Sequence, residues 1–415
     1  MVVQVTREQV LLHRERAQQL DRAPASTTDA LSPTVLDAGV QDTGPDGAAW
    51  ALVLRGVEPA AARAALAAGD DPPAPLALAW TLRGAPHAYR RADLPGVLVA
   101  VQPWSHRDAA RRVLDASRPL TAAGIPSGVA LAAVARTMRE VVTGPVVKGD
   151  VSTLLTGRMP EPFLRWCRPC GATHLYEMPF RLAALHAGLE LDPGTSPPVL
   201  RPVPGWPRDL ADRAAAALEH LPDGLTGDEP PPDGPDVDGP GGDGPLGRTD
   251  AVVSALRLLG PMRAAELAGY LDAHPADVRV RIATSLAEGR VAEVDVDGTT
   301  AVALTEDVEA LRSAGPSDRG VVRLLGPFDL FLQARDRERL VPDAARRKEL
   351  WPTLGRPGAV LHDGEVVGTW RPRSAGSRLR VQLDPWVPWA PAVEEGVDEQ
   401  VALLGAFRGV AASRA

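Results

Sequence analysis

The sequence is poor in lysine and cysteine and has no long apolar run, and each shortage excludes a class of protein. Only Lys148 and Lys348 among the 45 basic residues are lysines. Arginine keeps its proton near neutral pH, so a mechanism with an amine nucleophile has few positions available. Two cysteines, Cys167 and Cys170, are too few for a disulfide framework. No run of about 18 apolar residues is present, so no membrane span is expected.

The first residues, MVVQVTREQV, lack the basic segment and apolar core of a signal peptide. We therefore expect a cytoplasmic protein, associated with the nucleoid if it binds DNA. The net charge is −8, but residues 221–250 hold eight acids against the single base Arg248 and so contribute −7 of it. The rest of the chain is nearly neutral, and its charge is compatible with a DNA partner.

Residues 221–247 consist mainly of Pro, Gly and Asp. A segment with so few apolar side chains cannot bury enough surface to become ordered, so residues 221–248 are predicted to be a disordered linker. Gly242, Gly244 and Gly247 match the spacing GxGxxG. No strand pattern precedes them and no helix pattern carries them, so a dinucleotide site is not expected.

The most readable domain follows this linker. Apolar spacing predicts two short helices between residues 251 and 271, and Pro275 is well placed to begin a third. Asp297-Gly298 separates two runs of alternating apolar and polar residues, which predicts a β-hairpin. Three helices followed by a hairpin are typical of a winged-helix domain.

Fainter copies of this order lie upstream, and short strand patterns begin near Gly320. The predicted fold class is therefore α+β, mostly α, with three tandem winged-helix domains and a C-terminal β-rich, barrel-like domain. The expected parts are a first winged-helix domain (1–95), a second (96–220), the linker (221–248), a third winged-helix domain (249–318) and the β-rich domain with a closing helix (319–415).

Three polar residues, Gln41, Asp42 and Thr43, follow an apolar segment over residues 28–40 that is expected to be helical. Adjacent residues on a helix diverge by about 100°. Gln41 and Asp42 can therefore face one cleft only where the helix ends, which Gly44-Pro45 predicts. The alternative is that Asp42 or Thr43 caps the next helix, and both interpretations remain open.

The stretches GVQDT, WTLRGAPH, FDLFLQARDRERL and VLHDGEVVGTWR give the chain a resemblance to the AlkZ-like winged-helix DNA glycosylases over nearly its whole length. The resemblance implies a C-shaped scaffold around double-stranded DNA that excises bulky alkylated purines and unhooks interstrand crosslinks. It also implies a catalytic motif, Gln-x-Gln or Gln-x-Asp, whose polar positions fall on Gln41 and Thr43. Here Thr replaces the second amide or carboxylate, and Asp42 lies between.

The expected function is that of a monomeric, monofunctional DNA glycosylase that hydrolyses the N-glycosidic bond of N7-alkylated purines, without a metal or cofactor. Gln41 would orient the attacking water, and Asp42 would stabilise the cationic sugar or accept a proton. The alternative is a catalytically silent winged-helix DNA-binding protein with a regulatory or damage-shielding role.

Basic residues in two stretches are candidates for DNA contact. The stretch LRGAPHAYRR follows a strand pattern, and two arginines lie on the third predicted helix after the linker, opposite its apolar stripe. A turn with a histidine bonded to backbone is the alternative for the first stretch. The candidates are Arg83, His87, Arg90, Arg91, Arg279 and Arg281.

Cys167-x-x-Cys170 is followed by His174 and Glu177, which are residue types that ligate metals. A closed zinc site needs four ligands, usually from two separated pairs, and the chain has one CxxC pair. No metal site is therefore predicted. Placed on a helix, the cysteines and His174 share one face, which favours a buried, reduced structural role.

Overall fold

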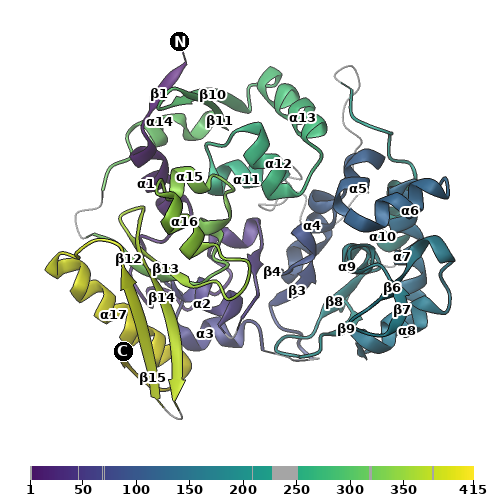
Figure 1. Ribbon diagram of the computed structural model, residues 1–415, viewed down its shortest axis with the longest axis horizontal. Helices are drawn as coiled ribbons and strands as arrows, with labels where there is room; N and C mark the ends of the chain where they lie inside the picture. The colour runs from purple at the N-terminus through teal and green to yellow at the C-terminus, as the bar shows by residue number, and fades with distance from the viewer. Residues whose placement is uncertain are drawn as a thin grey trace. The chain divides into compact units, whose positions relative to one another are not determined.

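A computed structural model describes residues 2–44, 46–67, 69, 71–207, 209–226, 251–316, 320–375 and 378–415 (Figure 1). These residues form two compact units, each built from separate stretches of the chain. The first unit contains Met1–Ala65, Val253–Leu267 and Gly289–Ala415, and the second contains Leu66–Val252 and Ala268–Glu288. Most of the predicted linker lies outside the described residues.

The first unit begins with strand β1 (Val3–Val5) and helix α1 (Arg7–Ala17). A capping box starts α1: Thr6 Oγ1 accepts from the Gln9 backbone N–H at 3.2 Å, and Gln9 Oε1 accepts from the Thr6 N–H at 2.8 Å.

The helix expected over residues 28–40 is wrong. The structure has one 3₁₀ turn, η1 (Thr34–Asp37), and a short strand, β2 (Val40–Gln41). Pro33 precedes the turn and Gly39 has φ +80°, so the chain cannot continue as a helix on either side. The two helices that follow are α2 (Gly47–Val53) and α3 (Pro59–Ala64).

The β-hairpin predicted at Asp297-Gly298 is confirmed. Strands β10 (Val291–Val296) and β11 (Thr299–Leu304) pair antiparallel, and both turn residues have positive φ, 48° and 83°, as a two-residue hairpin loop requires. Strand β1 joins β10 in parallel, with Val3 opposite Val294. The helices near this hairpin in sequence are α11 (Ala251–Leu259), α12 (Ala264–Leu271) and α14 (Val308–Arg312).

The C-terminal part of the first unit contains a curled, half-barrel sheet in the order β12-β13-β14-β15-β16. Only the last pair, β15 with β16, is parallel. The turn at Asp363-Gly364 between β13 and β14 is confirmed, whereas the next predicted turn lies partly outside the described residues. The strands are β12 (Val322–Leu325), β13 (Gly358–His362), β14 (Glu365–Ala375), β15 (Arg378–Pro385) and β16 (Ala411–Arg414).

Helices connect and close this sheet. The longest is α17 (Pro391–Arg408), which confirms the closing helix predicted from the sequence and packs on β12 (Figure 1). Gly396 permits this packing, because a Cβ there would lie 2.7 Å from Val322 Cγ2. The shorter helices are η6 (Thr305–Asp307), η7 (Leu330–Gln333), α15 (Arg337–Leu340) and α16 (Ala344–Leu350).

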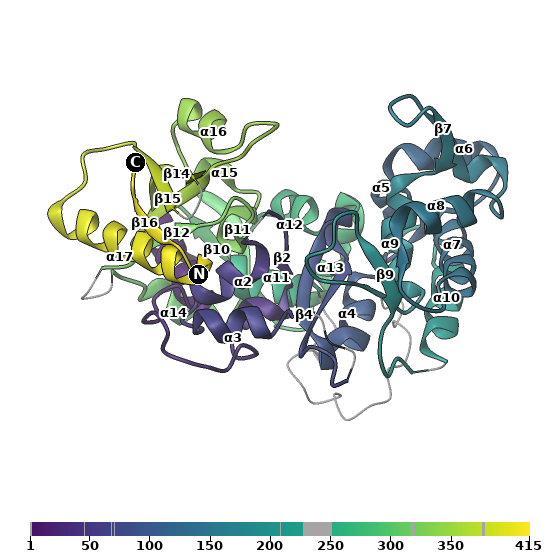
Figure 2. The ribbon, with the colours of Figure 1, turned by 90° about the horizontal axis from the view of Figure 1, so that it is seen from below.

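The second unit combines a sheet, in the order β4-β3-β8-β9-β5, with a group of helices. Helix α7 lies at the centre of this group and contacts α5, α8, α9 and α10 (Figure 2). The strands are β3 (Leu76–Trp80), β4 (Pro86–Arg90), β5 (Val146–Val147), β8 (Leu189–Leu191) and β9 (Val199–Pro202). The helices are η2 (Leu82–Gly84), η3 (Arg91–Asp93), α4 (Leu94–Val101), α5 (His106–Arg112), η4 (Leu114–Ala116), α6 (Ser117–Ala122), α7 (Ser127–Val141), α8 (Lys148–Thr156), η5 (Glu161–Phe163), α9 (Glu177–His186), α10 (Leu210–Glu219) and α13 (Pro275–Ala287).

Residues 162–189 contain a separate hairpin followed by α9. The hairpin pairs β6 (Leu164–Cys167) with β7 (Ala172–Leu175). The structure as a whole mixes α and β elements and carries a curled C-terminal sheet. The three winged-helix domains and the domain boundaries remain predictions.

In the described parts of the chain no single helix has the length and hydropathy of a membrane span. One pair of helices, Leu114–Ala122 and Ser127–Val141, has the length and composition of a membrane span when the two are taken together. The chain bends by 104° between them.

Candidate active site around Gln41

A cavity of about 550 Å³ lies within the first unit, beside the end of β2 and the start of α2. Gln41 and Thr43 line it together with Trp50 of α2 and Trp370 of β14. Both indoles are buried, and each donates its N–H to a carbonyl of β12 at 2.8 Å, Trp50 to Leu324 and Trp370 to Leu325. These two side chains are therefore fixed parts of the cavity wall.

Gln41 and Thr43 are connected by a hydrogen bond. The amide Nε2 of Gln41 donates to the Thr43 hydroxyl at 3.0 Å. Side chains alternate along an extended chain, so residues 41 and 43 share one side while residue 42 lies on the other. The bond fixes the amide and leaves Gln41 Oε1 without a hydrogen-bond partner in the part of the chain that the structure describes.

Asp42 is not among the described residues that line the cavity. Its Oδ1 accepts from the Ala48 backbone N–H at 2.8 Å, at the first turn of α2. Gly47 has φ +42°, and a Cβ there would collide with the Asp42 carboxylate. The capping interpretation of Asp42 is thus confirmed. The geometry gives no support to a catalytic role for this residue.

Two carboxylates line the cavity, those of Asp46 and Asp329, and an arginine neutralises each of them. Both oxygens of Asp329 accept from Arg55 at 2.9 Å, and the two side chains are 1% and 0% exposed. Asp46 accepts from Arg408 Nε at 2.8 Å. Among the described lining residues, then, the cavity contains no unpaired carboxylate that could act as a strong base.

The positive charges of the cavity, unlike its carboxylates, are not neutralised by ion pairs in the part of the chain that the structure describes. Arg356, Arg371 and Arg373 line the cavity, and none has a carboxylate partner within the described ranges. Arg371 donates to the Gly355 carbonyl at 2.7 Å, and Arg373 to Gln382 Oε1 at 3.1 Å. The guanidinium of Arg356 lies 5.2 Å from the centre of the Phe328 ring. The cavity is therefore electropositive.

Leu354 is also part of the cavity lining, and it is 86% exposed. It precedes Gly355, whose φ of +65° turns the chain towards Arg356. An apolar side chain this exposed contributes little to the stability of the fold, because it is not buried in the core. It is available to a partner that enters the cavity.

The sequence-based prediction found Gln41 and Thr43 but missed these arginines and Leu354. One signal was present in the sequence: Arg371 and Arg373 are two residues apart in a strand pattern, so both fall on the same face. Nothing in the sequence indicated that this face lies beside Gln41, more than 300 residues away.

A second cavity in the first unit, of about 740 Å³, is lined by a run of charged residues from Arg335 to Arg339. Most of its charges are paired: Asp336 binds Arg14 at 2.7 Å and Arg339 at 3.0 Å, and Arg263 binds Glu266 at 2.7 Å. This run is therefore largely salt-bridged. Its internal pairing makes the cavity a weaker candidate for chemistry than the one around Gln41.

The predicted DNA-binding residues belong to the second unit. His87 is 3% exposed, and its Nδ1 lies 3.0 Å from Thr81 Oγ1 and 2.9 Å from the Ala85 carbonyl. Burial, reinforced by the charge of Arg83, lowers the pKa of His87 to about 3, against a smaller opposing effect of the Ala85 bond. A neutral, buried imidazole does not support the predicted phosphate contact.

The neighbouring arginines are engaged with protein groups. Arg83 donates to the Tyr270 carbonyl at 2.6 Å, Arg90 pairs with Asp93 at 3.2 Å, and Arg91 pairs with Glu190 at 2.6 Å. Their DNA contacts stay predictions.

Arg279 and Arg281 lie on α13. Arg279 is exposed and has no ion pair in the described residues, whereas Arg281 lies over the Trp104 ring at 5.5 Å. Buried Asp277 anchors this helix, accepting from Ser105 Oγ at 2.6 Å and Arg107 Nε at 2.9 Å. Of the six predicted DNA-binding side chains, Arg279 is therefore the most available to a phosphate.

Comparison with known proteins identifies the fold and the family of the chain. Among solved structures, the chain shares its fold with a DNA glycosylase, AlkZ of Streptomyces sahachiroi: the match covers 100% of both chains with a TM-score of 0.67 and 19% sequence identity. The sequence model of the family described as DNA glycosylase AlkZ-like matches residues 35–407. The chain belongs to the AlkZ-like DNA glycosylase family, which confirms the resemblance seen in its sequence. No curated protein sequence matched the chain.

Proposed function

We propose that this DNA glycosylase hydrolyses the N-glycosidic bond of purines alkylated at N7, using a water held by Gln41. One observation carries the proposal: the Gln41–Thr43 pair lines an electropositive cavity in which the described carboxylates are already paired with arginines. Such a site is suited to a leaving group that needs little help from a strong acid or base.

An N7-alkylated purine is such a leaving group. It carries a positive charge before it meets the enzyme, so its bond to C1′ is weakened and its departure needs no added proton. The remaining task is to place a water beneath C1′ as the sugar becomes cationic. Gln41 Oε1 can accept a hydrogen bond from that water, because Nε2 is occupied by Thr43.

The rest of the cavity lining serves the DNA. Arg356, Arg371 and Arg373 supply guanidinium groups for phosphates that flank the lesion. Leu354 supplies an apolar side chain that can enter the base stack when the damaged nucleotide is displaced. Arg279 is a further candidate for backbone contact.

We also propose that the enzyme acts on double-stranded DNA as a monomer and without a cofactor for the chemical step. One chain supplies both the water-holding pair and the arginines of the cavity, so no second copy is needed to complete the site.

The test is a single-turnover assay on a duplex that contains one N7-methylguanine, with released base and abasic sites both measured. Gln41→Ala should slow excision at least about tenfold, the scale of a positioned catalytic group. Asp46→Asn is the control variant. Because the Asp46 carboxylate is paired with Arg408, this change should alter the excision rate only a few-fold.

Binding of the same duplex should be measured for both variants, so that a loss of affinity is not mistaken for a loss of chemistry. Equal rates for wild type and Gln41→Ala would remove Gln41 from the mechanism. A rate that falls with Asp46→Asn alone would indicate a carboxylate-based mechanism instead.

A further inference from the structure

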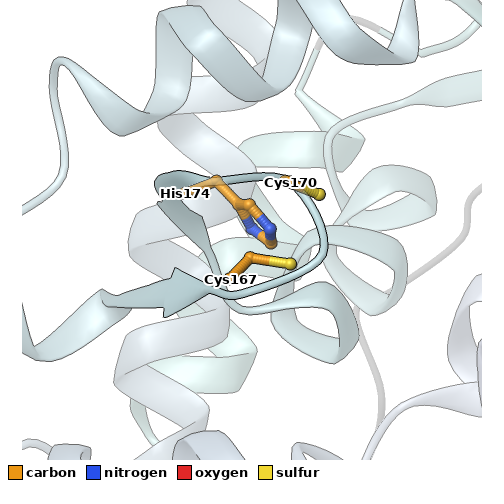
Figure 3. Close-up of side chains that lie close together, drawn as sticks. All are labelled: Cys167, Cys170 and His174. Atoms are coloured by element: carbon orange, nitrogen blue, oxygen red, sulfur yellow. The ribbon is translucent and has the colours of Figure 1, made fainter.

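The hairpin of β6 and β7 in the second unit brings together Cys167, Cys170 and His174. One ligand atom from each residue lies within 4.8 Å of the other two (Figure 3). The helical placement expected from the sequence is wrong: Cys167 ends β6, Cys170 is in the turn and His174 is in β7. Burial is also wrong as an expectation, because Cys170 is exposed and Cys167 is only partly covered.

The turn geometry favours a shared ligand. Cys167 pairs with Ala172 across the hairpin, so residues 168–171 form a tight loop in which Gly171 has φ +61°. The imidazole of His174 is directed towards the thiol of Cys167 on the inner side of this loop (Figure 3). Both free sulfurs and one ring nitrogen therefore face a common point.

His174 is held in the manner of a metal ligand. Its Nδ1 donates to the Leu175 carbonyl at 2.7 Å, which leaves Nε2 with its lone pair. Metal-binding histidines usually have one ring N–H bonded to a carbonyl or carboxylate, since this bond fixes the tautomer and the ring orientation. The fourth residue suggested by the sequence, Glu177, is occupied by Lys148 at 2.8 Å and Arg181 at 2.6 Å.

The turn end of the hairpin has no buried side chain, because residues 168–173 are all exposed. A two-stranded sheet is marginally stable alone. Leu175 at the base of this one is buried, whereas Trp166 near the turn is 65% exposed. A bound ion is the usual substitute for a core in so small an element.

We propose that Cys167, Cys170 and His174 bind one zinc ion through two sulfurs and imidazole Nε2, with a water in the fourth position. Two thiolates and one imidazole suit this borderline-soft ion. Both thiols release their protons on binding, so the site gains an ion of charge +2 and loses two protons. The ion fixes the turn of the β6–β7 hairpin and has no part in the excision chemistry proposed for Gln41.

The test uses the full chain, reduced and then freed of metal. Zinc content after equilibration and desalting should be one per chain for wild type. Cys170→Ser and His174→Ala should each weaken zinc binding at least about tenfold, because even loss of a residue that only orients a ligand costs about that much. His220→Ala, which changes an exposed histidine elsewhere in the same unit, should retain the zinc.

Two further readings separate a built site from loose binding to thiols. Cobalt in place of zinc should give thiolate-to-metal absorption and tetrahedral bands, and zinc should slow amide hydrogen exchange in residues 164–175. Reduced wild type that takes up no zinc, or takes up as much with Cys170→Ser, would overturn the proposal. All these readouts are independent of base excision, so they do not depend on the proposed glycosylase mechanism.

Discussion

The side-chain amide of Gln41 donates to the hydroxyl of Thr43 at 3.0 Å. The AlkZ-like resemblance places a second Gln or an Asp where this chain has Thr43. Threonine is shorter, yet its hydroxyl still accepts the amide N–H and so holds the Gln41 side chain in one orientation. We therefore expect the substitution to preserve the orientation of Gln41, which makes Thr43 a positioning residue for the proposed reaction.

Thr43→Val should slow excision of N7-methylguanine about three- to tenfold, the value of one hydrogen bond. The change keeps the shape of the side chain and removes the hydroxyl, so the cavity wall is retained while the Gln41 amide can rotate. Thr43→Ser restores the hydroxyl and should recover most of the rate. Single-turnover rates measure this series, and a serine variant as slow as the valine variant would refute the positioning role.

Asp42→Ala should lower stability and leave chemistry nearly intact, because the carboxylate caps α2 outside the cavity lining. The expected loss in the free energy of unfolding is about 1 kcal/mol, typical of a removed helix cap. Urea unfolding measures it, and single-turnover excision should change less than twofold. A tenfold slower rate with unchanged stability would instead make Asp42 catalytic.

The pH dependence of the same residue gives an independent check. Burial raises the pKa of the Asp42 carboxyl above its ordinary value of 3.8, partly offset by the Ala48 N–H. The folded protein then holds the proton more tightly than the unfolded chain, so the stabilisation that comes from protonating Asp42 is full at low pH and is lost as pH rises through the raised pKa. The hydrogen bond from the Ala48 N–H is a separate contribution. Asp42→Asn keeps the acceptor without the charge, so its stability relative to wild type should rise with pH. A relative stability that falls with pH would contradict this assignment.

Arg356→Ala and Arg373→Ala should each weaken DNA binding and its salt dependence. An arginine that meets one phosphate contributes about one unit to the slope of log affinity against log salt concentration, so each variant should lose about that much. Arg158→Ala is the control, since Arg158 is in the second unit and pairs with Glu140 at 3.4 Å. Slopes equal to that of wild type for both cavity variants would show that the cavity does not meet the DNA backbone.

How much of this could be predicted from the sequence depended on whether the signal was local. Asp297-Gly298 predicted its hairpin because both positions need positive φ, and the closing helix was expected where α17 lies. The helix expected before Gln41 failed because Gly39 and Pro33 override that spacing. The wrong helix also led to a wrong prediction for the site. At a helix end Gln41 and Asp42 would face one cleft, whereas in the extended chain Gln41 is hydrogen-bonded to Thr43.

Long-range features were beyond the sequence. Cys167, Cys170 and His174 are near in sequence, but their apolar neighbours fit a helix as well as a hairpin, and only the hairpin brings the three ligands together. Arg356 and Arg371 reach Gln41 through the folding of the C-terminal sheet, which no local pattern records. The sequence thus identified the residue proposed to hold the water but not the surface proposed to hold the DNA.

Leu354→Ala should slow excision from a fully paired duplex about tenfold and should not change stability, because the side chain is 86% exposed. An apolar residue that replaces the displaced base matters most when that base is paired and stacked, since unstacking costs a few kcal/mol. The same variant should lose much less on a duplex in which the N7-methylguanine lies opposite an abasic site. Leu154→Ala, at an exposed leucine of α8, should leave both rates unchanged. Equal slowing by Leu354→Ala on both duplexes would mean that Leu354 contacts the damaged base or shapes the cavity, and has no role in the base stack.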